Sequence, residues 1–242
     1  MCVVIALLGG CMVGAPDEEE DEEPYLDTGV QPGDGKLDGA SSVASVVSST
    51  CSTAPVRGLS LQIAEELRCM SPGLLVPFAP TRTIRFASAA VLPYLEAETA
   101  EALLRAAPEV GAVTINSGLR SVAQQYLLHS WQRAGRCGIR VAATPGRSNH
   151  ETGRAVDLAN SAEARTEMLD EAFSPVRRDP VHFDHLASPD LRSLNVEAFQ
   201  RLWNRNHADD AISEDGLYGS ETATRLARSP AGGFAVGSTC AP

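Results

Sequence analysis

Hydrophobic positions follow two periods along the chain, one typical of helices and one typical of strands. Apolar side chains recur every three or four residues in segments that predict helices, at 60–69, 87–107, 121–134, 161–173, 194–206 and 220–228. Between them, short apolar or alternating runs predict strands at 112–116, 155–158 and 178–185. The pattern predicts an α+β fold, in which a small antiparallel sheet has flanking helices and a small all-α module follows at the C-terminus.

The stretch from Gly146 to Leu158 places polar side chains in an order that suits a metal site. Two ligands of one zinc ion each lie about 2 Å from the metal. On a straight helix, His150 and Asp157 would be separated by roughly 10 Å of rise. A turn at Gly153 followed by a strand would instead point Asp157 away from its apolar neighbours and back toward His150. The segment is therefore predicted to be a loop followed by a strand.

A third ligand is expected in the run of residues 178–185. In an extended segment His182 and Asp184 share one face, whereas His185 lies on the other. We take His182 as the third ligand and His185 as the alternative. Two imidazoles and one carboxylate leave the fourth position of a tetrahedral zinc open for water, as in hydrolytic sites. Asp179, three residues before His182, is then a candidate general base.

Three short patterns within residues 110–187 resemble those of one family. They are S-x-H-x-x-G-x-A-x-D at Ser148, His150, Gly153, Ala155 and Asp157, an acid three residues before a histidine at Asp179 and His182, and a run similar to S-G-Y-R-S-x-x-x-Q at Ser117, Gly118, Leu119, Arg120, Ser121 and Gln125. The family is that of the zinc D-alanyl-D-alanine carboxypeptidases and L-alanyl-D-glutamate endopeptidases, which share a core with lysostaphin and the hedgehog signalling domain. The resemblance implies Zn²⁺ as cofactor, bound by His150, Asp157 and His182, and a peptidoglycan peptide as substrate.

The resemblance also implies roles for other side chains. Arg120 would stabilise an oxyanion or clamp a substrate carboxylate, which its fixed charge and planar fork suit. Ser148 and Gln125 would hydrogen-bond the peptide. Two departures stand in the patterns, because Leu119 replaces the usual Tyr and Asp179 replaces the Glu of many members. The shorter acid must lie closer to the water or work less well.

The resemblance leaves two kinds of function open. The first is hydrolysis of a stem-peptide bond, by a carboxypeptidase or an endopeptidase, and which bond is cut is not decided by these patterns. The second is a non-catalytic, zinc-containing protein that binds the cell wall. Asp179 and Arg120 favour the peptidase, because binding of zinc requires neither of them.

The N-terminal part of the chain has a different composition from the rest. Residues 1–11 form an apolar run that resembles a lipoprotein signal ending at the lipidated Cys11, with a buried N-terminal strand as the alternative. Residues 12–50 are acidic and then rich in Ser, which predicts a disordered linker. Residues 17–38 carry ten acids and one lysine, and so account for −9 of the net charge of −11. The remaining chain is nearly neutral and has no basic patch of the kind that nucleic-acid binding requires.

Cysteine usage and the apolar leader predict an exported protein, periplasmic or in the cell envelope, anchored to a bacterial membrane by lipid. Beyond the leader, the four cysteines Cys51, Cys69, Cys137 and Cys240 allow three pairings. Cys51 with Cys69 is the first choice, and free thiols and a cysteine zinc site are the alternatives. No protein partner is predicted.

The last fifty residues differ in character from the expected peptidase domain at 51–188. Residues 189–242 resemble the three-helix peptidoglycan-binding module, through an F-Q-x-x-x-N helix and a D-G-x-x-G-x-x-T turn. The matching positions are Phe199, Gln200, Asn204, Asp215, Gly216, Gly219 and Thr222. The alternative is a helical extension that packs on the enzyme.

Overall fold

A computed structural model describes residues 41–240 of the chain. The predicted lipoprotein signal at 1–11, with Cys11, and the acidic part of the linker lie outside these residues. Among the described helices, none is both long and apolar enough to cross a membrane.

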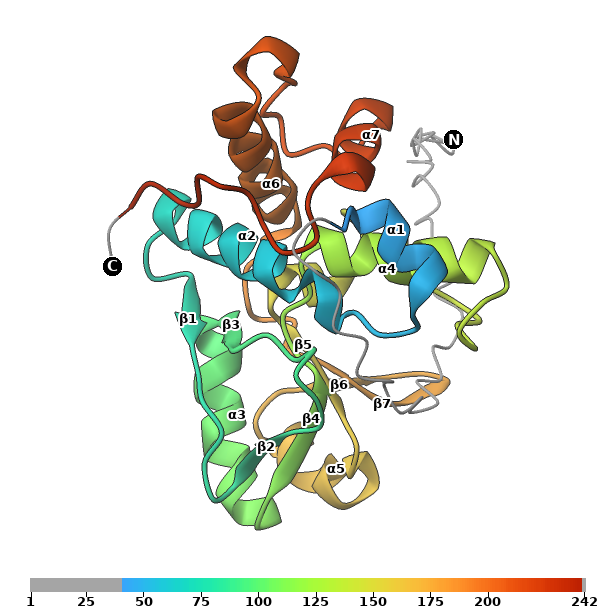
Figure 1. The fold of residues 1–242 in the computed structure, drawn as a ribbon. Coiled ribbons are helices and arrows are strands. Elements are labelled where there is room, and N and C mark those ends of the chain that lie inside the picture. The colour runs from blue at the N-terminus through green and yellow to red at the C-terminus, as the bar shows by residue number, and fades with distance from the viewer. Residues whose placement is uncertain (1–40, 241–242) are drawn as a thin grey trace, which may run out of the picture.

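The described chain forms helices that alternate with short strands (Figure 1). The helices are α1 (Val43–Ser49), α2 (Arg57–Met70), α3 (Ala97–Val110), α4 (Val122–Arg133), α5 (Ser161–Asp170), α6 (Arg192–Asn206) and α7 (Ser220–Arg228), with 3-10 turns η1 (Ala54–Val56), η2 (Asn149–Thr152) and η3 (Ala208–Asp210). The strands are β1 (Leu75–Pro77), β2 (Ile84–Phe86), β3 (Tyr94–Glu96), β4 (Val113–Ser117), β5 (Ala155–Leu158), β6 (Ser174–Val176) and β7 (Asp179–Asp184).

The main sheet has five strands in the order β2-β4-β5-β7-β6. All neighbours in it are antiparallel except β2 and β4, which are parallel. Apolar side chains of β4 and β5 pack with those of α3 and α5 in one hydrophobic cluster, which includes Ile115, Val156, Leu103 and Met168. A separate two-stranded sheet pairs β1 with β3. The prediction of an α+β fold is confirmed, and the sheet differs from the predicted antiparallel one only in the parallel pairing of β2 with β4.

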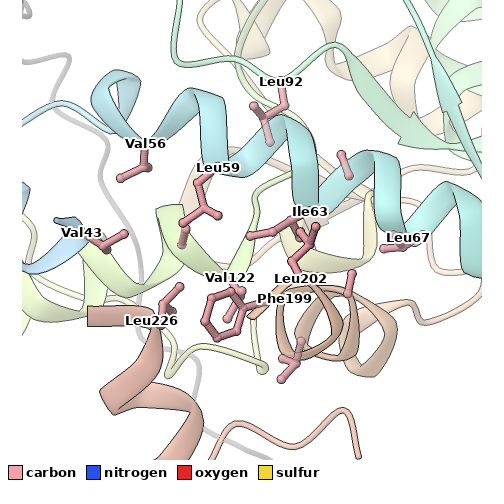
Figure 2. Close-up of a cluster of buried hydrophobic side chains, with 14 of the residues drawn as sticks. Val43, Val56, Leu59, Ile63, Leu67, Leu92, Val122, Phe199, Leu202 and Leu226 are labelled. Carbon is pink, nitrogen blue, oxygen red and sulfur yellow. The ribbon is translucent and has the colours of Figure 1, made fainter. Parts of the chain in front are cut away.

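A second hydrophobic cluster lies among helices from both ends of the described chain (Figure 2). Leu59 and Ile63 of α2 pack in it with Phe199 and Leu202 of α6 and with Leu226 of α7, and all five are almost completely buried. The predicted domain boundary at residue 188 thus separates two segments that share one hydrophobic core.

The prediction of a disordered linker as far as residue 50 is wrong for its last part. Residues 43–49 form α1, and Val43 and Val46 are completely buried in the second cluster. The backbone N–H of Val43 also donates to the carbonyl of Ser229, at 2.9 Å. The segment is too short and too rich in Ser and Val to be a stable helix alone. The sequence pattern did not reveal that α1 is buried against α7.

The predicted helix over 87–107 begins ten residues later than expected, at Ala97. Pro93 disfavours the helical conformation for the residue before it, and β3 follows it directly. The Glu96 side chain then caps α3 by accepting from the N–H of Thr99, at 3.1 Å. The polar cap and the proline together place the helix start.

The expected pairing of Cys51 with Cys69 is also wrong. The two disulfides of the structure are Cys51–Cys137 and Cys69–Cys240. Cys51 follows α1, which packs on α4, and this packing brings Cys51 to the chain just after α4. Cys69 lies in the last turn of α2, beside the C-terminal segment. The pairing depends on helix packing, which the spacing of cysteines does not encode.

We predict that Leu202→Ala will lower the free energy of unfolding of the whole described chain by about 2–5 kcal/mol, because it leaves a cavity in the shared core. Leu104→Ala is the matched control, because Leu104 lies on α3 with 50% of its surface exposed and should change stability by no more than about 0.5 kcal/mol. Denaturant unfolding followed by circular dichroism and by tryptophan fluorescence measures both. Two separate transitions, of which only one is shifted by Leu202→Ala, would contradict a shared core.

Candidate functional site

Two adjacent strands and the loop before them bring the predicted ligands together. Asp157 of β5 is paired directly with His182 of β7 in the antiparallel register. His150 lies in η2, and the chain turns into β5 at Gly153, which has a φ of 75°. A Cβ at Gly153 would lie 2.7 Å from the backbone nitrogen of Glu96, so this turn has both a conformation and a close approach that favour glycine.

The three side chains point one atom each at a common position. Nε2 of His150 lies 3.2 Å from Nδ1 of His182, which lies 3.0 Å from Oδ1 of Asp157. Nε2 of His150 is also 3.2 Å from Oδ2 of Asp157. Two donor atoms of a tetrahedral zinc, each about 2.0–2.1 Å from the metal, are roughly 3.3 Å apart. The spacing therefore suits ligation of one metal ion.

Hydrogen bonds at the outer ring nitrogens determine which atoms face the common position. Nδ1 of His150 lies 2.9 Å from the carbonyl oxygen of Gly118, which can only accept, so Nδ1 carries the hydrogen. Nε2 of His182 lies 3.0 Å from Oδ1 of Asp184 and donates to it. When the ring of His182 is neutral, Nε2 of His150 and Nδ1 of His182 therefore present lone pairs to each other. Facing lone pairs beside a carboxylate repel one another unless a cation or a proton lies between them.

The charges of the group fit a cation. Burial by itself raises the pKa of Asp157, but His150 and His182 hold it well below its usual value, so the carboxyl is ionised. Burial lowers the pKa of His182, but hydrogen bonds to Asp157 and Asp184 outweigh it and raise that pKa to about 10, so that without a metal ion its Nδ1 carries a proton, which a bound cation would replace. Within residues 41–240, Oδ2 of Asp157 is buried without a hydrogen-bond donor. A buried anionic oxygen without a donor is expensive, and a metal ion would remove that cost.

Asp179 lies at the start of β7 and lines the same cleft as His150 and His182. The side chain is buried, and within the part of the chain that the structure describes its Oδ1 has no hydrogen-bond partner. Burial, followed by the nearby charge of Asp157, raises the pKa of Asp179 to about 6. The site thus contains a carboxyl group with a free acceptor atom and a pKa suited to proton transfer near neutral pH.

Neighbouring side chains hold Arg120 beside His150, Asp157 and His182, which are called the candidate metal-ligand group below. Its guanidinium donates to Oγ of Ser117 at 3.1 Å and to Oε1 of Gln125 at 3.0 Å, and lies 3.7 Å from Oδ2 of Asp157. Gln125 also donates to the carbonyl of Ala143, at 2.7 Å, and is almost completely buried. Both polar atoms of Gln125 are therefore engaged inside the protein. Gln125 lines the cleft, but its side-chain oxygen accepts from Arg120 and its amide nitrogen donates to Ala143, so its contacts hold the guanidinium in place.

Ser148 lines the cleft and caps η2, and its Oγ accepts from the backbone N–H of His150 at 3.3 Å. Among residues 41–240 no acceptor binds its hydroxyl hydrogen. His185, the alternative third ligand, does not join the group: its Nδ1 lies 2.8 Å from Oγ of Ser188, in a buried pair. Among the described residues, His150, Asp157 and His182 form the sole group of at least three His, Cys, Asp or Glu side chains spaced for a metal ion.

Sequence reasoning gave no role to Glu151. Its completely buried carboxylate accepts from the backbone N–H of Gly146 at 2.9 Å and of Ser148 at 3.1 Å. Burial raises its pKa to about 7. Glu151 thereby fastens the loop that precedes His150. The signal for this role was a serine followed three residues later by a glutamate, which is the spacing of a capping box.

His150 and His182 of the candidate metal-ligand group line a cleft of about 1250 Å³. Arg120, Ser148 and Asp179 line this cleft, and so do residues 140–149 and 216–218. The C-terminal segment therefore contributes to the wall of the same cleft that contains the candidate catalytic groups.

A comparison with protein families finds one match. Residues 93–181 match the family model VanY, described as D-alanyl-D-alanine carboxypeptidase. The matched range contains Arg120, His150, Asp157 and Asp179, and ends one residue before His182. No significant match was found among curated proteins or among solved structures.

We predict that Asp184→Asn will weaken zinc binding by about 10–100-fold, because an amide oxygen accepts from Nε2 of His182 more weakly than a carboxylate and carries no negative charge. Competition with a fluorescent chelator measures the affinity. Asp170→Asn, an exposed site at the end of α5, is the control and should leave the affinity unchanged. Equal affinities of all three proteins would mean that Asp184 does not orient His182.

Proposed function

We propose that the chain hydrolyses a peptide bond in peptidoglycan stem peptides, because residues 93–181 match the family model VanY and the motifs resemble the same family. The reaction would be that of a zinc D-alanyl-D-alanine carboxypeptidase or a related endopeptidase. The observation that carries the proposal is the convergence of two imidazole rings and a carboxylate in the cleft that also contains Asp179, whose Oδ1 has no hydrogen-bond partner among the described residues. A protein that binds zinc only as a structural element has no use for that free carboxylate oxygen.

The proposed ligands are His150 of η2, Asp157 of β5 and His182 of β7. When bound, zinc would make a water molecule more acidic and polarise the scissile carbonyl. Glu151 holds the loop that carries His150, and Asp184 holds the ring of His182. The side chains that would bind the metal therefore need to move little when it binds.

Asp179 would supply the proton transfers. As a carboxylate it accepts a proton from the attacking water, and it then returns that proton to the amine that leaves. Arg120 would place its fixed charge near the carbonyl oxygen, where negative charge develops, or near a substrate carboxylate. The hydroxyl of Ser148 would donate to the peptide. Gln125 would act through Arg120, since both of its polar atoms are already engaged.

We also propose that the protein works outside the cytoplasm, where its substrate lies. Two disulfides support this, because such bonds persist in oxidising compartments. The lipid anchor at Cys11 stays a prediction from the sequence.

The direct test is digestion of purified peptidoglycan, with products identified by mass spectrometry. We predict release of D-alanine or of longer peptides that stops with a chelator and returns with added zinc. D-alanine alone would identify a carboxypeptidase, and longer fragments an endopeptidase. Asp179→Ala should keep zinc and the fold but lose 10²–10⁴-fold in rate, as is typical for a general base.

Two variants serve as controls for that test. His150→Ala should lose both zinc and activity, whereas Asp179→Glu keeps a carboxylate and should retain part of the activity. Zinc content is measured on every protein. If Asp179→Ala were fully active, Asp179 would not be the base, and if wild-type protein bound zinc but released nothing from any wall type, the non-catalytic alternative would replace the peptidase.

The rate should fall at low pH. A general base works only when ionised, so kcat/KM is lost as the pH falls through the pKa of Asp179. Burial raises this pKa to about 6, and a nearby cation would lower it, so we predict an acidic limb at or below about pH 6. Rates from pH 4 to 8, with zinc content checked at each point, measure the limb. Constant kcat/KM down to pH 4 with zinc retained would contradict the assignment.

A further inference from the structure

The loop between α6 and α7 forms part of the cleft wall although it lies outside the family-matched range. Gly216, Leu217 and Tyr218 line the cleft together with residues 140–147. Leu217 is 67% exposed, and Tyr218 is half-buried. An exposed leucine beside a tyrosine, facing a cleft that contains peptidase-like groups, has the composition of a binding surface.

The loop is held in one conformation by Gln200 of α6. The side-chain oxygen of Gln200 accepts from the N–H of Gly216 at 2.9 Å, and its amide donates to Asp215 Oδ1 at 3.0 Å and to the carbonyl of Leu217 at 3.2 Å. Gly216 has a φ of 69°, and a Cβ there would lie 2.7 Å from the carbonyl oxygen of Ser193. The loop therefore presents Leu217 and Tyr218 from a braced backbone.

Tyr218 also packs against the part of the cleft wall that contains Gly146. A Cβ on Gly146 would lie 3.2 Å from Cβ of Tyr218 and 3.4 Å from Val196, so the tyrosine packs closely on the segment that leads to Ser148. Among the described residues, the Tyr218 hydroxyl has no hydrogen-bond partner. The ring is thus fixed, while its polar end is free to bind a ligand.

Two arginines of the cleft wall also have no partner. Arg140 and Arg147 line the cleft and are exposed, and within residues 41–240 neither side chain makes an ion pair or a hydrogen bond. The cleft volume of about 1250 Å³ exceeds the 300–1,000 Å³ that is typical for a drug-sized ligand. The cleft has room for more than the two residues that flank a scissile bond.

We propose that Leu217 and Tyr218 form a subsite for the part of an acidic peptide substrate that lies away from the scissile bond. The two side chains pack against the peptide, and Arg140 and Arg147 pair with its carboxylates. The proposal rests on the proposed peptidase function. It adds that contacts with the C-terminal segment make the protein prefer longer peptides to short ones.

The test compares two synthetic substrates of different length, a stem pentapeptide ending in D-Ala-D-Ala and an N-acetylated D-Ala-D-Ala dipeptide. Tyr218→Ala is expected to lower kcat/KM about tenfold more for the pentapeptide than for the dipeptide, and Leu217→Ser about threefold more. Leu104→Ser, at an exposed leucine outside the cleft, is the matched control and should show equal ratios for both substrates. Zinc content is measured for each variant.

Direct binding separates this inference from the proposed function. Calorimetry of the pentapeptide is performed on Asp179→Ala, with and without Tyr218→Ala, and needs no turnover. A loss of binding of about tenfold supports the subsite even if the wild type hydrolyses neither substrate. Equal losses for both substrates, or unchanged binding, overturn it. Because Leu217 is exposed, Leu217→Ser still decides the matter if Tyr218→Ala fails to fold.

The charge contribution has its own measurement. The Arg140→Gln, Arg147→Gln double variant is compared with wild type on the pentapeptide and on the same peptide with its glutamate carboxylate amidated. Amidation should weaken binding to the wild type by several-fold and leave binding to the double variant unchanged. An equal effect of amidation on both proteins would remove the arginines from the proposed subsite.

Discussion

The antiparallel pairing of β5 with β7 is the constraint on which the site depends. It sets Asp157 directly opposite His182, and the glycine turn before β5 brings His150 to the same point. Two ring nitrogens and the two oxygens of the Asp157 carboxylate are thereby held close together in a buried position, with distances of 3.0–3.2 Å between the side chains. Such an arrangement is unfavourable by itself, because buried lone pairs and charges without partners cost free energy. The surrounding fold must hold it in place, and a bound cation would turn that cost into affinity.

The support comes from parts of the chain that are far apart in sequence. Asn195 of α6 is the clearest case, because its side-chain amide donates to the carbonyls of Arg120 at 3.1 Å and of Glu151 at 3.0 Å. Its oxygen accepts from the N–H of Val122, at the start of α4. Asn195, one buried side chain of α6, thus connects the loop that carries Arg120 with the loop that carries His150. The shared core of α2 and α6 keeps this helix in position (Figure 2).

The sequence was most informative where the signal is local. The glycine turn and the period of two predicted that His150 and Asp157 meet, because both act over a few residues, and the strand pattern at 178–185 together with the family resemblance added His182. Partners that depend on packing were not predictable in the same way. The burial of α1, the disulfide pairs and the role of Asn195 follow from which helices lie side by side, and no short-range pattern records that. Gln125 shows the same limit, because its motif position was clear and its inward direction was not.

The C-terminal segment shows how a motif can be present while its polar groups are already in use. Gln200 bonds to Asp215, Gly216, Leu217 and Thr222, and Asn204 bonds to both the N–H and the carbonyl of Ile212. These side chains shape the loop after α6 and have little capacity left for a ligand. What the loop offers to a ligand is the pair that the motif leaves unspecified, Leu217 and Tyr218, and these face the peptidase cleft. If the proposed peptidase function is right, this pair would place the segment at the substrate site, and its resemblance to a peptidoglycan-binding module stays a prediction.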